Sequence, residues 1–212
     1  MDDSAKESIL ARIRMALADA PEPAAASRAY RQHDERASVD IVAEFADRLR
    51  DYKAHIDLID EAALPGAIAA ACALYGMQRL VAPADVPALW IPPYVELLRD
   101  DSPLANDQLD ASDGVLTGCA FAIAQTGTIV LNSGAFQGRR ALSLVPDRHL
   151  CVVHSEQVVG IVPEGISRLL KESTRPITFI SGPSATSDIE LSRVEGVHGP
   201  RTLHVFLVKT TH

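Results

Sequence analysis

Small hydroxyl residues and glycine gather in residues 181–188, which read Ser-Gly-Pro-Ser-Ala-Thr-Ser-Asp. An apolar run at 177–181 predicts a strand before them, and we expect a short helix after them. In open α/β sheets, ligands lie beyond the carboxyl ends of strands. Hydroxyl and backbone N–H donors at such a junction can bind an anion, helped by the helix dipole. The candidate ligand contacts here are Ser181, Gly182, Ser184, Thr186 and Asp188.

The same segment has a second interpretation as an ordinary turn. Asp188 or Ser187 would then cap the following helix. The spacing matches neither the G-x-x-x-x-G-K-[ST] phosphate loop nor the G-x-G-x-x-G dinucleotide motif. The segment therefore gives no ground for predicting a nucleotide, and a binding role and a turn remain open as alternatives.

A second glycine-flanked turn, residues 196–201, carries a histidine in the order Gly-Val-His-Gly-Pro-Arg. Its small neighbours would let the His198 imidazole reach solvent or a ligand, with Gly199 as an adjoining contact. Because the reference pKa of histidine is about 6.5, His198 is the candidate general acid or base. A turn histidine bonded to nearby backbone fits the same pattern. His204 falls within a predicted strand, and we expect it to be structural.

Residues 125–128, Gln-Thr-Gly-Thr, precede another apolar run. A glycine between two threonines permits close approach of a ligand to the backbone, or forms a bulge. The candidate contacts here are Gln125, Thr126, Gly127 and Thr128. Arg139 and Arg140 form the chain's one Arg-Arg pair, a potential clamp for a carboxylate or phosphate. In an acidic protein such neighbours also serve as surface ion-pair formers whose side chains point apart.

Motifs for metal binding and for nucleophilic catalysis are missing from the sequence. Cys72, Cys119 and Cys151 form no C-x-x-C pair, and the seven histidines include no H-E-x-x-H motif. A G-x-S-x-G nucleophile elbow is also missing. We therefore expect no metal, iron–sulfur cluster or other cofactor in this chain. Unpaired thiols fit a reducing compartment, and Cys119 in its apolar stretch is expected to be a small buried residue.

Composition and charge exclude several classes of protein. The 212 residues carry a formal net charge of −8, with 47% hydrophobic and 23% charged residues. These fractions are typical of a globular protein, and the acidic charge argues against nonspecific nucleic-acid binding and anionic membranes. The sequence begins without the features of a secretory signal, and no apolar run reaches the ~18 residues of a membrane span. We expect a soluble, cytoplasmic protein.

The elements that must position these residues fall into two parts. Residues 1–37 predict a helix that ends before Pro21 and a linker without periodicity, which packs on the body or serves a partner. Residues 38–212 are expected to form one α/β domain. Several strands are apolar on both faces, so we predict a three-layer α/β/α fold with a mostly parallel sheet. Helices are predicted from Ser38, over 62–74 and from Pro163, and strands at 55–59, 79–82, 114–117, 128–132, 150–154, 177–181 and 203–208.

Four segments in this order resemble the LUD domain family: residues 124–128, 138–146, 181–190 and 196–200, which lie within roughly residues 113–208. The resemblance implies a fold similar to the NagB/RpiA/CoA-transferase-like proteins. It also implies a role in oxidising L-lactate to pyruvate, as one component of a three-protein system. Iron–sulfur clusters would belong to the partner subunits. This chain would bind a small anionic ligand, scaffold the complex, or do both.

One position departs from the family pattern. Gln125 stands where a glutamate often precedes Thr-Gly-Thr, and an amide cannot act as a carboxylate nucleophile or base. Acyl transfer through Gln125 is therefore disfavoured, whereas binding through the backbone of residues 126–128 is unaffected.

Three hypotheses remain for the function. The favoured one is a non-redox subunit of an L-lactate-oxidising complex, with a pocket among residues 126–128, 181–188 and 198–199. The second is a stand-alone enzyme acting on a small phosphorylated or acyl substrate. It would resemble the CoA transferases, sugar-phosphate isomerases or folate cyclo-ligases of similar architecture, although a shared fold is weak support. The third is an assembly module whose pocket is vestigial.

Overall fold

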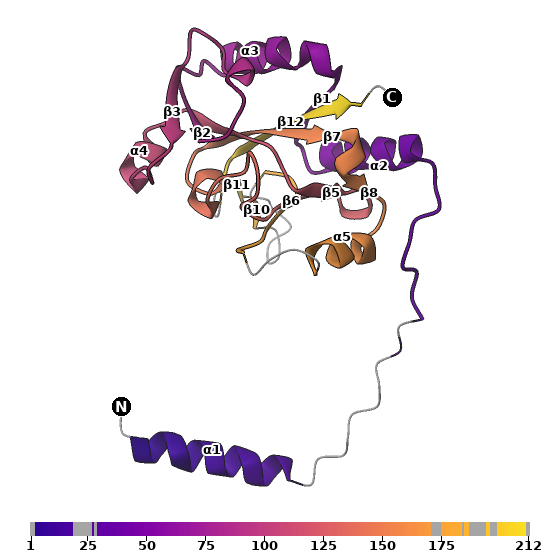
Figure 1. Ribbon diagram of the computed structural model, residues 1–212, viewed down its shortest axis with the longest axis vertical. Coiled ribbons are helices and arrows are strands. Elements are labelled where there is room, and N and C mark those ends of the chain that lie inside the picture. The colour runs from indigo at the N-terminus through magenta and orange to yellow at the C-terminus, as the bar shows by residue number, and fades with distance from the viewer. Residues whose placement is uncertain are drawn as a thin grey trace. The chain divides into compact units, whose positions relative to one another are not determined.

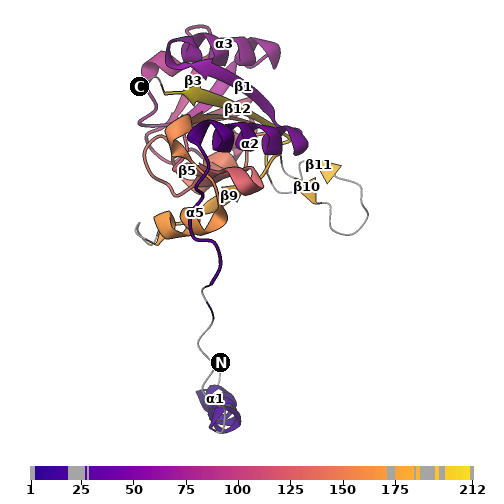
Figure 2. The same cartoon turned by 90° about the vertical axis from the view of Figure 1, so that its right-hand side faces the viewer.

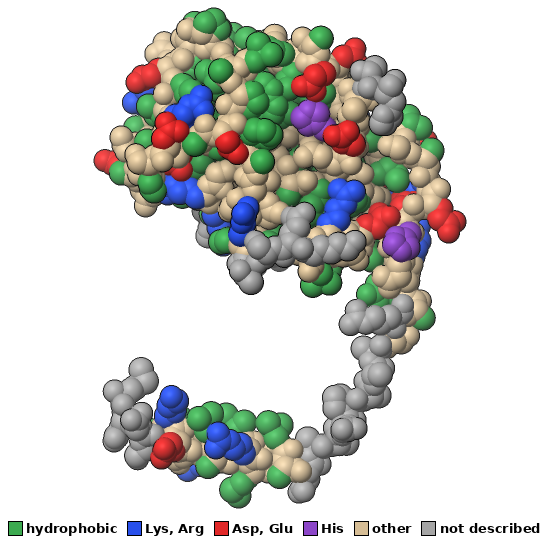
Figure 3. All heavy atoms as spheres, viewed as in Figure 1, with side chains coloured by type: hydrophobic (Ala, Val, Ile, Leu, Met, Phe, Trp, Pro, Cys, Tyr) green, Lys and Arg blue, Asp and Glu red, His purple; other side chains and the backbone are tan. Residues whose placement is uncertain are grey.

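The computed structural model describes residues 3–18, 27, 29–170, 175–183, 185–186, 194–195 and 199–210 (Figure 1). The chain divides into two compact units, Met1–Tyr30 and Arg31–His212. The first unit contains the predicted N-terminal helix, α1 (Asp3–Leu17). Its apolar side chains, including Ile9 and Ile13, are exposed, and Figure 3 shows such side chains along the helix.

A six-stranded sheet forms the centre of the second unit. Every neighbouring pair of its strands is parallel. Residues Leu203 to Val208 are all buried, because this strand is covered on both faces and its apolar run suits that position. The strand order is β1 (His55–Asp60), β12 (Thr202–Lys209), β7 (Arg148–His154), β4 (Gly114–Thr117), β2 (Arg79–Pro83) and β3 (Glu96–Asp100).

Helices cover both faces of this sheet, and Figure 2 shows α3 and α2 on opposite sides. Helix α3 (Leu64–Leu74) packs through Ile68 against a cluster that includes Phe206. Helix α2 (Ser38–Asp51) buries Phe45 and Leu49 in the cluster on the other face. The arrangement is consistent with the predicted three-layer α/β/α fold.

A second sheet shares the α2 face of the central sheet. Its order is β8 (Val158–Val159), β5 (Phe121–Ile123), β6 (Thr128–Leu131) and β9 (Thr178–Ile180). Strand β6 is antiparallel to both β5 and β9. One side of the sheet joins the α2 core through Ile129. Phe121 and Val130 belong to a separate cluster that also contacts α5 (Val162–Leu169).

The remaining elements are short. They are helix α4 (Asn106–Asp110), the 3-10 segments η1 (Glu61–Ala63), η2 (Ala88–Trp90), η3 (Ala124–Thr126), η4 (Arg140–Ser143) and η5 (Ser155–Gln157), and strands β10 (Ala185–Thr186) and β11 (Val194–Glu195). Strands β10 and β11 pair in antiparallel register. No helix among the described residues is long and apolar enough to cross a membrane.

One expectation about residues 177–188 is wrong. The strand before Ser181 is β9, which pairs antiparallel with β6 in the second sheet, so the carboxyl-end rule for parallel sheets does not apply to it. Within the hydroxyl-rich segment, Ala185 and Thr186 lie in β10, as suits a β-branched residue such as Thr186. The short helix expected after Asp188 falls on residues outside the described part of the chain and stays a prediction.

Residues 31–37 belong to the second unit, where Asp34 fixes them to the start of α5. The Asp34 N–H donates to Glu164 Oε1 at 3.0 Å, and its carboxylate pairs with Arg36. The pair with Arg36 lowers the pKa of Asp34 to about 2. A Cβ on Gly160 would lie 2.2 Å from Asp34 Oδ2, so glycine is required where the chain crosses. This part of the predicted linker therefore packs on the α/β body.

Candidate functional site

Three of the predicted hydroxyl residues form one hydrogen-bonded cluster. Strands β6 and β9 place Thr128 opposite Ser181, and their hydroxyl oxygens lie 2.8 Å apart. Thr126 Oγ1 lies 2.7 Å from Thr128 Oγ1. Thr128 is 6% exposed, so its hydroxyl group needs hydrogen-bond partners within the protein. The cluster supplies these partners, whether or not it also binds a ligand.

The two glycines beside this cluster are explained by helix packing. Gly127 has φ +58°, and a Cβ there would lie 2.7 Å from Arg48 Cβ of α2. Gly182 has φ +84°, and a Cβ there would lie 2.6 Å from Tyr52 Cβ. The close backbone approach expected for a ligand at Gly127 is thus made by α2 itself.

A hollow of about 390 Å³ opens beside the hydroxyl cluster, lined by Arg48, Asp51, Tyr52, Gln125 and Thr126. The Gln125 amide oxygen accepts the Val162 N–H at 3.2 Å, so this side chain helps to fix the start of α5. Arg48 faces Asp51 and Glu44 within 4 Å. Acidic groups therefore compensate Arg48, the one cation among the described residues that line this hollow.

Arg139 and Arg140 are not brought to the hydroxyl cluster. The Arg139 guanidinium donates to both oxygens of Asp100, with the shortest contact at 3.0 Å, and to the Leu104 carbonyl. Arg140 is exposed. The two side chains thus have separate environments, as expected for adjacent ion-pair formers rather than for one clamp.

Several predicted residues lie outside the part of the chain that the structure describes. They are Ser184, Asp188 and His198, together with the side chain of Thr186. Gly199 is described, with φ +143° just before β12. The roles of these residues stay predictions.

The carboxyl ends of the parallel strands lie away from the hydroxyl cluster. There, the loops that follow two adjacent strands leave toward opposite faces of the sheet. After β2 the chain passes to the α3 face, where Val86 and Trp90 join the core. After β4 it passes to the opposite face, into the second sheet. Loops that leave adjacent strands toward opposite faces open a crevice between them, the usual ligand site of an open α/β sheet. The topology therefore places a candidate site beside the ends of β2 and β4.

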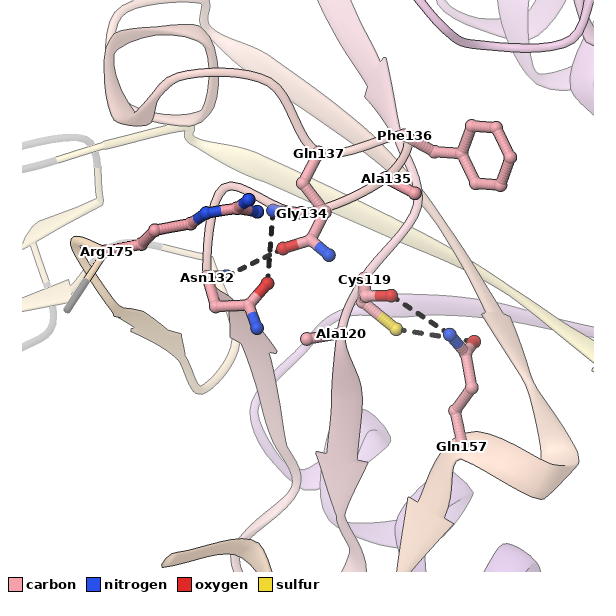
Figure 4. Close-up of a pocket in the computed structure, with 9 residues that line it drawn as sticks. All are labelled: Cys119, Ala120, Asn132, Gly134, Ala135, Phe136, Gln137, Gln157 and Arg175. Atoms are coloured by element: carbon pink, nitrogen blue, oxygen red, sulfur yellow. Dashed lines mark hydrogen bonds between the residues drawn. The ribbon is translucent and has the colours of Figure 1, made fainter. Parts of the chain in front are cut away.

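A pocket of about 500 Å³ lies at this end of the sheet (Figure 4). Cys119 follows β4, Gln157 follows β7 in η5, and a loop after β6 supplies most of the remaining wall. None of these residues was predicted as a ligand contact. The one sequence feature that could have indicated the pocket is the polar side chain of Gln157, just beyond the predicted strand at 150–154. The lining residues are Cys119, Ala120, Asn132, Gly134, Ala135, Phe136, Gln137, Gln157 and Arg175.

The loop after β6 is held in an unusual conformation. Ser133 and Phe136 have φ values of +56° and +61°, which cost energy for residues with a side chain. Gln137 Oε1 accepts the Asn132 N–H at 2.6 Å, and Asn132 Oδ1 accepts the Gly134 N–H at 3.1 Å. Figure 4 shows Gln137 and Asn132 reaching toward one another across the pocket. These amides pre-organise the wall.

Buried polar groups continue beneath the pocket. Gln157 donates to the Cys119 carbonyl at 2.9 Å, and the Cys119 thiol donates to Gln157 Oε1 at 3.6 Å. Contact with Cys151 and burial raise the pKa of Cys119 well above its ordinary value, whereas the same contact lowers that of Cys151. Cys119 therefore faces the pocket as a neutral thiol, which is a poor nucleophile.

His149 lies in the same layer between the sheets. Its Nε2 contacts Thr117 Oγ1 at 2.7 Å. Within the described part of the chain, its Nδ1 is buried without a hydrogen-bond partner. Among those residues, no group of three or more His, Cys, Asp or Glu side chains is placed to hold a metal ion.

Comparison with known proteins identifies related sequences and one related fold. A family model described as the LUD domain matches residues 86–208. "Lactate utilization protein C" of Deinococcus radiodurans is 49% identical over 195 residues, covering 91% of this chain and 86% of that protein. The protein of the same name from Geobacillus kaustophilus is 31% identical, covering 69% of this chain and 70% of its own.

A solved structure supports the fold. The crystal structure of a DUF162 family protein from Deinococcus radiodurans superposes with a TM-score of 0.72 and is 44% identical in sequence. The match covers 82% of this chain and 99% of that chain.

Proposed function

This chain belongs to the LUD domain family, and we propose that it serves in lactate utilization. The observation that carries the proposal is its extensive similarity to proteins named lactate utilization protein C. The similarity spans nearly the whole chain in the Deinococcus radiodurans relative, so it includes both the central sheet and the residues around the pocket.

The finer proposal is that the chain is a non-redox subunit of an L-lactate-oxidising complex. Iron–sulfur clusters in proteins are held mainly by four cysteine thiolates, and the whole sequence contains three cysteines. Cys72 packs in the α3 core, whereas Cys119 and Cys151 lie in the core of the opposite face. Electrons would therefore pass through iron–sulfur partner subunits, and the contribution of this chain would be to bind a small anionic ligand and to support the complex.

Gln125 argues for this proposal over a stand-alone acyl-transfer enzyme. Its amide supplies no carboxylate nucleophile, and its oxygen is used to accept the Val162 N–H. The conformation of the loop after β6 argues against a vestigial pocket. Ser133 and Phe136 have positive φ values, and such strained backbone is typically kept at functional sites such as ligand-binding loops.

Growth on defined carbon sources tests the role in lactate utilization. A strain lacking the gene should fail on L-lactate and grow normally on pyruvate, and the wild-type gene should restore growth. Affinity capture of the tagged chain from lactate-grown cells should recover iron–sulfur proteins. Normal growth of the deletion strain on L-lactate would overturn the proposal.

A further inference from the structure

We propose that the 500 Å³ pocket at the carboxyl ends of β4 and β7 binds a small 2-hydroxy or 2-oxo carboxylate, with Arg175 as its charged partner. The choice of acid class rests on the proposed function, whereas the position and the anion preference rest on the structure. The hydroxyl cluster of Thr126, Thr128 and Ser181 is then a structural feature of the second sheet.

Position is the first argument. The loop after β6 crosses the switch between β2 and β4 and is bonded to the segments that follow both strands. Phe136 donates its N–H to Asp85 Oδ2 at 2.8 Å, beyond β2, and accepts the Gly118 N–H at 2.8 Å, beyond β4. The wall of the pocket is therefore anchored on both sides of the crevice where open α/β sheets bind ligands.

Charge is the second argument. Arg175 is the one charged side chain among the described residues that line this pocket. Its Nη1 donates to the Ser133 carbonyl at 3.3 Å, which directs the guanidinium toward the β6 loop. Figure 4 shows the side chain extending toward Gly134. A guanidinium held at one nitrogen retains further N–H donors for a carboxylate, and such bonds are stronger than those between neutral groups.

The uncharged polar groups fit the rest of such an acid. Asn132, Gln137 and Gln157 place amide groups around the pocket, and amides can pair with a hydroxyl or keto oxygen beside a carboxylate. Gly134 keeps this space open, because a Cβ there would lie 2.8 Å from Asn132 Oδ1 and 3.0 Å from Gln137 Nε2. The volume exceeds that of a three-carbon acid, so ordered water would share the pocket.

The other hollow is a weaker candidate for an anion. Its Arg48 faces Glu44 and Asp51, and Asp51 is itself part of the lining. A carboxylate placed there would meet a like charge. The pocket containing Arg175 has no acidic lining residue among those described.

Calorimetric titration of the full chain with L-lactate and with pyruvate tests the assignment. Arg175→Ala should weaken binding of at least one of these acids by about tenfold, since it removes charge-assisted hydrogen bonds. Arg175→Lys keeps the positive charge but lacks the planar guanidinium, so its affinity should lie between those of the wild type and Arg175→Ala. Arg50→Ala is the matched control, because Arg50 is an exposed arginine paired with Asp47 and lines neither hollow.

Arg48→Ala distinguishes the two hollows. The proposal predicts unchanged affinity in this variant. Loss of binding in Arg48→Ala with wild-type affinity in Arg175→Ala would overturn it, as would the absence of binding of either acid to the folded wild-type chain. Neither result affects the growth test, so the role in lactate utilization can stand while this pocket assignment fails. If binding depends on Arg175 but the chain is dispensable for growth on L-lactate, the pocket assignment stands and the role in lactate utilization fails.

Discussion

Asp85 and Phe136 join the end of β2 to the loop after β6 through one hydrogen bond, from the Phe136 N–H to Asp85 Oδ2 at 2.8 Å. Phe136 is held at φ +61°, and its ring lies 5.9 Å from the ring of Trp90. The bond therefore helps to keep a backbone conformation that the residue type does not favour. It also couples the wall of the pocket to the core beneath α3.

Removing this acceptor should loosen the loop. We expect Asp85→Ala to lower the free energy of unfolding by about 1 kcal/mol, and Asp85→Asn, which keeps an acceptor oxygen, to lower it less. Because Trp90 is the chain's one tryptophan, its fluorescence in a urea titration reports both unfolding and the local environment. Equal stability of Asp85→Ala and wild type would show that the bond does not hold the loop.

The packing of Gly127 against α2 predicts a large difference between two glycine substitutions. Gly127→Ala forces a side chain into the left-handed region and against Arg48, so we expect a loss of about 2–3 kcal/mol. Gly66→Ala, within α3 where a Cβ meets nothing within 4 Å, should instead stabilise by about 0.5–1 kcal/mol. Thermal unfolding of both variants gives the comparison. A Gly127→Ala variant as stable as Gly66→Ala would contradict the packing.

Arg139 and Arg140 should differ although they are neighbours. Arg139→Ala leaves the Asp100 carboxylate, 7% exposed, without its cation, and we expect a loss of about 2–3 kcal/mol. Arg140→Ala removes an exposed side chain and should change stability by less than about 0.5 kcal/mol. Denaturant titrations of the two variants measure this difference. Similar losses in both would revive the interpretation of the pair as one functional unit.

His204 should make stability depend on pH. Burial lowers its pKa below 6.5, opposed by Asp57, which lies 3.0 Å from Nε2. Its unfolded form binds a proton more readily, so its contribution is present above pH ~6.5 and is lost as pH falls from there toward the folded pKa.

A non-titrating replacement isolates this contribution. His204→Gln should flatten the fall in unfolding free energy as pH decreases from about 8 to about 5, relative to wild type. Substitution of exposed His33 by glutamine is the control and should leave the profile close to that of the wild-type chain. An unchanged profile in His204→Gln would assign the pH dependence to other groups.

The elements that could be predicted from the sequence are those whose own residues carry a recognisable pattern of apolar and polar side chains. Residues 203–208 of β12 are apolar except for His204, and α2 repeats Phe45, Ala46 and Leu49 on one face, so both elements were predicted. Strand β5 has three residues, too few for a periodicity, and β3 carries charged residues at the edge of the sheet. Neither has the pattern that identifies a buried strand.

Pairing between distant segments is harder to foresee, and the candidate site depends on it. The strand at 178–180 was predicted, but its antiparallel pairing with β6 is decided by tertiary packing. That pairing brings Ser181 to Thr128 and separates both from the carboxyl ends of the parallel strands. The pocket combines Cys119, Gln157 and Arg175 with a loop held at positive φ, and no local spacing connects these residues.

A crystal structure of the full chain with L-lactate or pyruvate at saturating concentration tests the location of the ligand most directly. The account predicts the acid in the pocket lined by Cys119, Gln157 and Arg175, with its carboxylate within hydrogen-bond distance of the Arg175 guanidinium. An acid bound in the hollow beside Arg48, or no acid bound at either place, would contradict the account.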